Sequence, residues 1–164
     1  METLRILGID PGTATTGFGV VDRIGSTPKM LDYGVITTPP RLPIAERLLM
    51  IYNDLNQLLE AFKPNVVVME RLFFAKNQTT FIAVGKSTGV MQLAAAQKGI
   101  EVVEYTPPEI KQAVTGEGNA EKHQVQYMIQ RILSIKEIPK PDDAADALAI
   151  CICHAHSERL KNAK

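Results

Sequence analysis

Short apolar runs that end at turn-forming residues predict the strands of this chain. The first run covers residues 4–9, is too short for a helix, and stops at Asp10, which is followed by Pro11 and Gly12. Proline has no N–H to donate to a strand ladder and glycine tolerates most backbone angles, so this strand ends in a turn. The same criteria predict further strands at residues 16–22, 29–37, 65–70 and 101–105.

Apolar residues at three- and four-residue steps predict helices in the rest of the chain. The clearest covers residues 44–62, where Ile51, Leu55 and Leu59 share one face and Pro64 follows the end. Asn119 or a near neighbour should cap one helix, and Asp142 should cap the last. The remaining helices are expected at about residues 79–98, 107–114, 120–133 and 142–161.

The order of these elements predicts one mixed sheet. Three strands come first, and only a few residues separate the first two, so they should pair as an antiparallel hairpin. Residues 66–69 are apolar on both faces, as in a central parallel strand. We therefore expect an α/β fold with a five-stranded mixed sheet and helices on both faces, in a single domain at residues 1–164.

The composition is typical of a globular protein. Of the residues, 45% are apolar and 22% charged, and no apolar run reaches the ~18 residues of a membrane span. We expect no signal peptide, a cytoplasmic location and reduced thiols at Cys151 and Cys153. The formal net charge is zero, which argues weakly against a nucleic-acid partner. If metal occupied four acids, however, 18 basic residues would outnumber the remaining 14 acidic ones by 4.

Acidic residues stand at the ends of two predicted strands and at the start of the last helix. Asp10 and Glu70 each end an apolar run, and Asp143 and Asp146 are three positions apart, which places both on one face of a helix. Taken singly, each is better explained as a solvated strand end or an acid that suits a helix N-terminus. Together they are expected at one edge of the sheet, outside the carboxyl ends of the strands, where α/β sheets carry their sites.

Four clustered carboxylates predict a metal site. They repel one another and cannot all ionise alone, whereas two divalent cations would balance their charge. Oxygen ligands favour Mg²⁺, with Mn²⁺ as a substitute. Two such ions about 3.5–4 Å apart hydrolyse phosphodiesters, because one activates water and the other stabilises the leaving oxygen. A zinc site is not expected, because one helix would place the nearby thiols and imidazoles on different sides; these are Cys151, Cys153, His154 and His156.

Several short motifs occur in order along the chain. They are GIDPG at residues 8–12, TGFGV at 16–20, FFAKN at 73–77 after Glu70, AEK at 120–122 and DAADALA at 143–149. Together they resemble the RuvC family of Holliday-junction resolvases over essentially the whole chain. The resemblance implies a ribonuclease-H-like fold, a homodimer, and Mg²⁺-dependent paired nicking of four-way DNA junctions in recombination and repair.

The resemblance also implies roles for individual residues. Lys111 and Lys122 match basic positions near the scissile phosphate, and Phe73 matches an aromatic residue that packs on junction bases. Lys76 is a further expected phosphate contact. The family's acidic tetrad, which binds metal and carries out catalysis, is matched by Asp10, Glu70, Asp143 and Asp146.

Some features stay open at the level of sequence. Arg71 and His123 depart from the residues common in relatives, and neither is given a role. The helix at residues 79–98 is rich in small residues, which suits either a dimer interface or close packing on its own sheet. The family usually works beside a branch-migration helicase, which no residue here indicates.

Two alternative functions remain. The first is a nucleotide-binding domain of the actin and sugar-kinase type, which also opens with an Asp-x-Gly-Thr hairpin; a chain of 164 residues lacks a second lobe to close over ATP. The second is a non-catalytic DNA-binding module whose acids are only helix caps. ATP binding would support the first alternative, and metal-dependent nicking would exclude the second.

Overall fold

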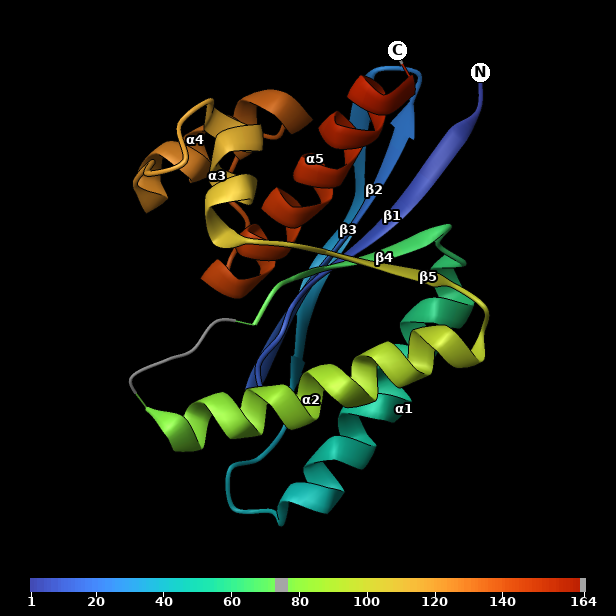
Figure 1. Cartoon of the computed structure of the whole chain (residues 1–164), viewed down its shortest axis with the longest axis vertical. Coiled ribbons are helices and arrows are strands. Elements are labelled where there is room, and N and C mark those ends of the chain that lie inside the picture. Colours follow the sequence, from blue (N-terminus) through green and yellow to red (C-terminus); the bar gives the residue numbers. More distant parts are fainter. Residues whose placement is uncertain (73–76, 163–164) are drawn as a thin grey trace.

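The structure is a computed structural model that describes residues 1–72 and 77–162, and it contains a five-stranded sheet (Figure 1). The strand order is β3-β2-β1-β4-β5; β1, β2 and β3 are antiparallel neighbours, and β4 and β5 run parallel to β1. The predicted mixed sheet is confirmed. The strands are β1 (Thr3–Asp10), β2 (Thr15–Ile24), β3 (Thr27–Thr37), β4 (Val66–Glu70) and β5 (Glu101–Tyr105).

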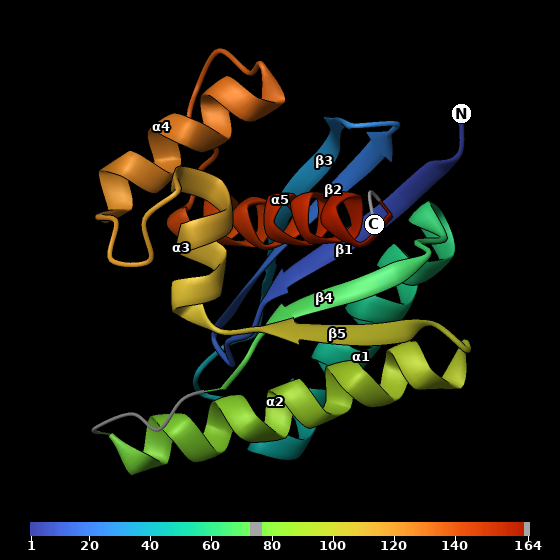
Figure 2. The same cartoon turned by 45° about the horizontal axis from the view of Figure 1, so that its top comes forward.

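Helices cover both faces of the sheet, as expected. Figures 1 and 2 show α3, α4 and α5 on one face and α1 and α2 on the other. No helix within residues 1–72 and 77–162 is long and apolar enough to cross a membrane. The helices are α1 (Ile44–Phe62), α2 (Gln78–Gln97), α3 (Pro107–Thr115), α4 (Lys122–Leu133) and α5 (Asp142–Asn162).

Two apolar layers hold the helices to the sheet. The side chains of β1 and β4 alternate between them, because successive residues of a strand point to opposite faces. Ile6 and Val68 pack under α5, whereas Leu7 and Val67 pack against α1 and α2, and all four are fully buried. This alternation directs Asp10, like Gly8 before it, toward α5.

Glycines in the sheet let α5 approach closely. A Cβ at Gly17 would lie 1.9 Å from the carbonyl oxygen of Asp143, and one at Gly8 would lie 2.4 Å from that of Ala147. Both distances are far below van der Waals contact, so any larger residue would push the helix away. Because glycine has no Cβ at these two positions, the first two turns of α5 lie against β1 and β2.

The helix starts differ slightly from expectation. The predicted helix at 120–133 begins at Lys122, with Glu121 rather than Asn119 as the N-cap, because Gln124 Oε1 accepts the Glu121 N–H at 2.8 Å in a capping box. Asp142, the expected cap of the last helix, is itself the first residue of α5, and its carboxylate pairs with Lys122 at 2.9 Å. This ion pair joins the starts of α4 and α5.

Candidate active site

The carboxyl ends of β1 and β4 bring the first two acids together. Ile9 pairs with Met69 in the parallel ladder, so Asp10 and Glu70 follow at the same level of the sheet. Asp143 and Asp146 lie above them in the first two turns of α5. Two strand ends and one helix start thus deliver the four predicted acids to one place.

Three of the four acids form a close cluster. Carboxylate oxygens of Asp10, Asp143 and Asp146 all lie within 4.8 Å of one another. Glu70 lines the same cavity as Asp10 and Asp146, a hollow of about 300 Å³. Apolar residues beside the acids keep the carboxylates partly away from water. They are Pro107, Ile110, Val125, Ala149 and Ile150.

Burial and repulsion change the acidity of Asp10 most strongly. Loss of hydration is the largest cause, followed by the charges of Asp146, Glu70 and Asp143, and together they raise the pKa of Asp10 to about 8. Without a cation, Asp10 therefore retains its proton at pH 7. Ionising Asp10 beside the other acids is therefore unfavourable, and a bound cation would favour the charged carboxylate.

Two lysines moderate the charge of the other acids. Burial raises the pKa of Glu70, with a contribution from Asp146, while Lys111 acts in the opposite direction. Burial likewise raises the pKa of Asp146, which Lys122 lowers. Both lysines line the cavity, and their positive charges act on the acids there.

Lys122 also takes part in a second ion pair. Its Nζ lies 2.9 Å from Asp142 Oδ2, and this hydrogen bond is the main reason why the pKa of Lys122 is raised. The side chain is 54% exposed, so it stands at the mouth of the cavity rather than inside it.

The other residues singled out in the sequence contact groups other than the four acids or lie outside the described residues. Phe73 and Lys76 belong to the latter. The Arg71 N–H donates to the carbonyl oxygen of Tyr105 at 2.7 Å, and exposed His123 lies 3.3 Å from Glu121. Each of the four cysteine and histidine residues of α5 contacts a different group; the pairs are Cys151 with Gly19, Cys153 with Glu109, His154 with Tyr105 and His156 with Ala113.

The sequence did not indicate how the cavity is closed on its outer side. Pro107 and Ile110 of α3 and Val125 of α4 form this wall. The N-capping Thr106 accepts the Glu109 N–H at 3.3 Å and turns the chain from β5 into α3 beside the acids. A proline directly after a capping residue is the one local signal of this turn.

The sheet order and the acids beyond its strand ends define a nuclease-type α/β fold of the ribonuclease-H-like class. A solved structure described as "T. thermophilus RuvC in complex with Holliday junction substrate" superposes with a TM-score of 0.92 and 36% identity, covering 96% of each chain. The yeast mitochondrial Holliday junction resolvase Ydc2 shares the fold, with a TM-score of 0.73 at 14% identity over 97% of this chain and 81% of its own.

The particular family follows from the sequence comparisons. The chain belongs to the family described as "Crossover junction endodeoxyribonuclease RuvC", whose profile matches residues 6–154. A relative of that name from Syntrophomonas wolfei is 50% identical over 97% of this chain and 92% of its own. Another from Desulfitobacterium hafniense is 52% identical, with 97% and 96% covered. The family resemblance inferred from the motifs is confirmed.

Proposed function

We propose that this chain resolves four-way DNA junctions by hydrolysing one phosphodiester bond in each of two symmetry-related strands, during recombination and repair. One observation carries the proposal: in a member of the RuvC family, carboxylates from β1 and α5 converge within 4.8 Å on a cavity that Glu70 also lines. The Thermus thermophilus relative is described in complex with a Holliday junction substrate, which supports the same substrate class here.

Asp10, Glu70, Asp143 and Asp146 are proposed as the metal ligands and catalytic acids. The donor set fits divalent cations, because burial and mutual repulsion raise the pKa values of Asp10, Glu70 and Asp146 and a cation reverses both effects. All donors are carboxylate oxygens, which favours Mg²⁺ with Mn²⁺ as a substitute, and four negative charges balance two ions. When bound, such ions supply an activated water and stabilise the leaving oxygen.

The remaining cavity residues orient the DNA backbone. Lys111 and Lys122 face the acids and are placed to bind non-bridging phosphate oxygens, which holds the scissile bond over the carboxylates. The Asp142 carboxylate keeps the Lys122 ammonium at the cavity mouth. Ile110 and Ile150 line the cavity with apolar surface and exclude water from it, which strengthens the charge interactions beside them.

A homodimer is proposed because paired nicking needs two active sites related by a two-fold axis. The exposed face of α2 is the proposed interface: Ile82 is 56% and Leu93 54% exposed, and a Cβ added at Gly89 would meet no atom within 4 Å. Phe73 is proposed to stack on an unpaired base, worth about 1–3 kcal/mol, and Lys76 to bind phosphate. A cytoplasmic location is proposed from the two free cysteines, and a partner branch-migration helicase from the family resemblance.

The experiment that tests the function is cleavage of a synthetic four-way junction. Wild type with Mg²⁺ should give paired symmetric nicks, whereas Asp10→Asn and Glu70→Gln should bind the junction and not cleave it. Glu46→Gln serves as the matched control, because Glu46 is an exposed acid in the first turn of α1 on the opposite face. Nicking by Asp10→Asn at the wild-type rate would refute the assignment.

The same assay separates the alternative functions. A non-catalytic DNA-binding module would bind the junction and leave it intact with every metal tested. A nucleotide-binding domain of the actin and sugar-kinase type would bind ATP with an affinity that junction DNA does not change. Membership of the RuvC family over residues 6–154 favours the nuclease over both.

A further inference from the structure

We propose that the hydrogen bond between Tyr105 and His154 is a positioning contact, which sets the location of Glu70 relative to the aspartates of α5. Tyr105 Oη lies 2.9 Å from Nδ1 of His154, which belongs to the C-terminal half of α5, whereas Asp143 belongs to its first turn. The proposal rests on the proposed function, because it gives Tyr105 a part in the binding of metal by Glu70. Tyr105 is a positioning residue, which acts through the backbone of Glu70.

Glu70 depends on β5 for its place in the sheet. The pairing of β1 with β4 ends at Ile9 and Met69, one residue before Glu70. Glu70 itself pairs with Tyr105, and the next residue, Arg71, donates its N–H to the Tyr105 carbonyl oxygen at 2.7 Å. The backbone of Tyr105 is therefore the lateral support of the Glu70 backbone. Whatever fixes Tyr105 also fixes Glu70.

The side chain of Tyr105 is fixed by α5. His154 is 4% exposed and its ring centroid lies 5.9 Å from that of Tyr105. Burial lowers the pKa of His154, so the imidazole is neutral at pH 7 and suited to a hydrogen bond with a phenol. His154 follows Asp146 by eight residues, about 12 Å along the helix axis. One rigid helix thus carries both the catalytic aspartates and the two side chains that hydrogen-bond the Tyr105 hydroxyl, His154 and Ser157.

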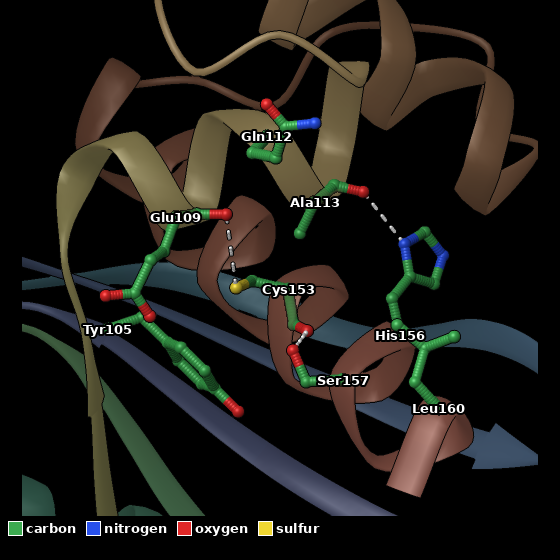
Figure 3. A pocket seen from close by; sticks show the side chains of 8 residues that line it. All are labelled: Tyr105, Glu109, Gln112, Ala113, Cys153, His156, Ser157 and Leu160. Atoms are coloured by element: carbon green, nitrogen blue, oxygen red, sulfur yellow. Dashed lines mark hydrogen bonds between the residues drawn. The ribbon is translucent and has the colours of Figure 1, made fainter. Parts of the chain in front are cut away.

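The open space beside the Tyr105 ring makes the hydrogen bond to His154 important for the orientation of the ring. Figure 3 shows the Tyr105 ring beside a cavity between α3 and the C-terminal half of α5, with Cys153 and Ser157 on the α5 side. The cavity has a volume of about 730 Å³, so packing does not enclose the ring on that side. A half-buried aromatic ring beside open space relies on its polar tip for a fixed orientation.

The test measures Mn²⁺ binding by calorimetry on metal-free protein without DNA. Tyr105→Phe keeps the ring and removes the hydroxyl, and His154→Leu fills the imidazole space without an acceptor. Both should raise the Kd for Mn²⁺ about 3- to 10-fold, below the 10- to 100-fold typical of groups that bond directly to a ligand. His154→Asn places an amide near the Nδ1 position and should bind Mn²⁺ within about twofold of wild type.

The matched control is Tyr52→Phe, which removes the hydrogen bond from the Tyr52 hydroxyl to Gln97 between α1 and α2 on the opposite face. It should lower thermal stability and leave the Kd for Mn²⁺ unchanged. If Tyr105→Phe and His154→Leu lose stability yet bind Mn²⁺ as wild type does, Tyr105 is merely structural and the inference is wrong. If wild type itself binds no Mn²⁺, the proposed function fails, which is a different result.

Discussion

Replacement of Gly17 by alanine tests whether close packing of α5 sets the geometry of the acids. A Cβ at position 17 would lie 1.9 Å from the Asp143 carbonyl oxygen, 2.3 Å from its carbonyl carbon and 3.0 Å from the Ala144 nitrogen. All three atoms belong to the backbone, so no rotation of a side chain relieves the clash. The helix start has to move as a unit.

The distances give the size of this movement. Ordinary van der Waals contact begins at 3.4 Å, so a contact of 1.9 Å requires the first turn of α5 to withdraw by about 1.5 Å. Overpacking of this kind costs about 1–3 kcal/mol of unfolding free energy, which a protein with about 5–15 kcal/mol survives. A misplacement of about 1 Å at a reacting centre lowers rates about 100-fold. Gly17→Ala should therefore fold but lose at least that factor in junction cleavage.

Three measurements check this prediction: urea unfolding, Mn²⁺ affinity and single-turnover cleavage. Gly118→Ala is the control, since a Cβ there meets its nearest atom at 3.5 Å and the residue lies in the loop between α3 and α4. It should match wild type in all three. If Gly17→Ala cleaves the junction as fast as wild type, the close approach of α5 does not set the position of Asp143 and the reasoning is refuted.

Three further predictions concern charge, a structural ion pair and assembly. The pKa of Asp10 is raised from 3.8 to about 8, so the folded state holds a proton that the unfolded state releases, and in EDTA the unfolding free energy should fall by a few kcal/mol between pH 4 and 8. Urea titrations of Asp10→Asn should show a smaller decline with pH. Equal declines in the variant and wild type would contradict the assignment. The buried Asp22 carboxylate accepts hydrogen bonds from Arg5 Nε at 2.8 Å and from a second guanidinium nitrogen at 3.0 Å. Because the Arg5 side chain is 35% exposed, Asp22→Ala should lower the unfolding free energy by about 2–3 kcal/mol, less than the loss of a fully buried pair. Junction cleavage by this variant should be unchanged at a temperature where it stays folded. Leu93→Asp should convert a dimer to a monomer in sedimentation velocity, and a dimeric variant would exclude the exposed face of α2 as the interface.

The sheet could be predicted from the sequence because its signals are local. The apolar run before Asp10, the doubly buried β4 and the proline and glycine turns each act within a few residues, and β5 and α1 match their predicted bounds. The start of α4 was predicted two residues too early, at residue 120, with Asn119 or a near neighbour as the cap, because the capping box that Gln124 forms with Glu121 was not anticipated. Competition between nearby caps is decided by side-chain contacts that a single sequence does not rank.

The acids could be predicted, but their unequal environments could not. Asp10, Glu70 and Asp146 have the same carboxyl chemistry in the sequence, yet burial and three charged neighbours act most strongly on Asp10. The roles of Tyr105 and Pro107 were missed for a related reason. Both follow from which strand lies at the sheet edge beside β4, and strand order is a property of the whole fold.

The acidic site is held together by apolar packing against its own repulsion. Asp143 and Asp146 alternate with Ala144, Ala145 and Ala147 on α5, all of which are fully buried. Alanine has almost no side-chain entropy to lose and lets the helix axis lie close to the sheet. The same residues that bury α5 therefore hold its carboxylates beside Asp10, and the raised pKa of Asp10 reflects the cost of ionising it there. A bound cation would offset this cost only while the carboxylates stay close together, so tight packing of α5 and metal binding should weaken together in variants such as Gly17→Ala.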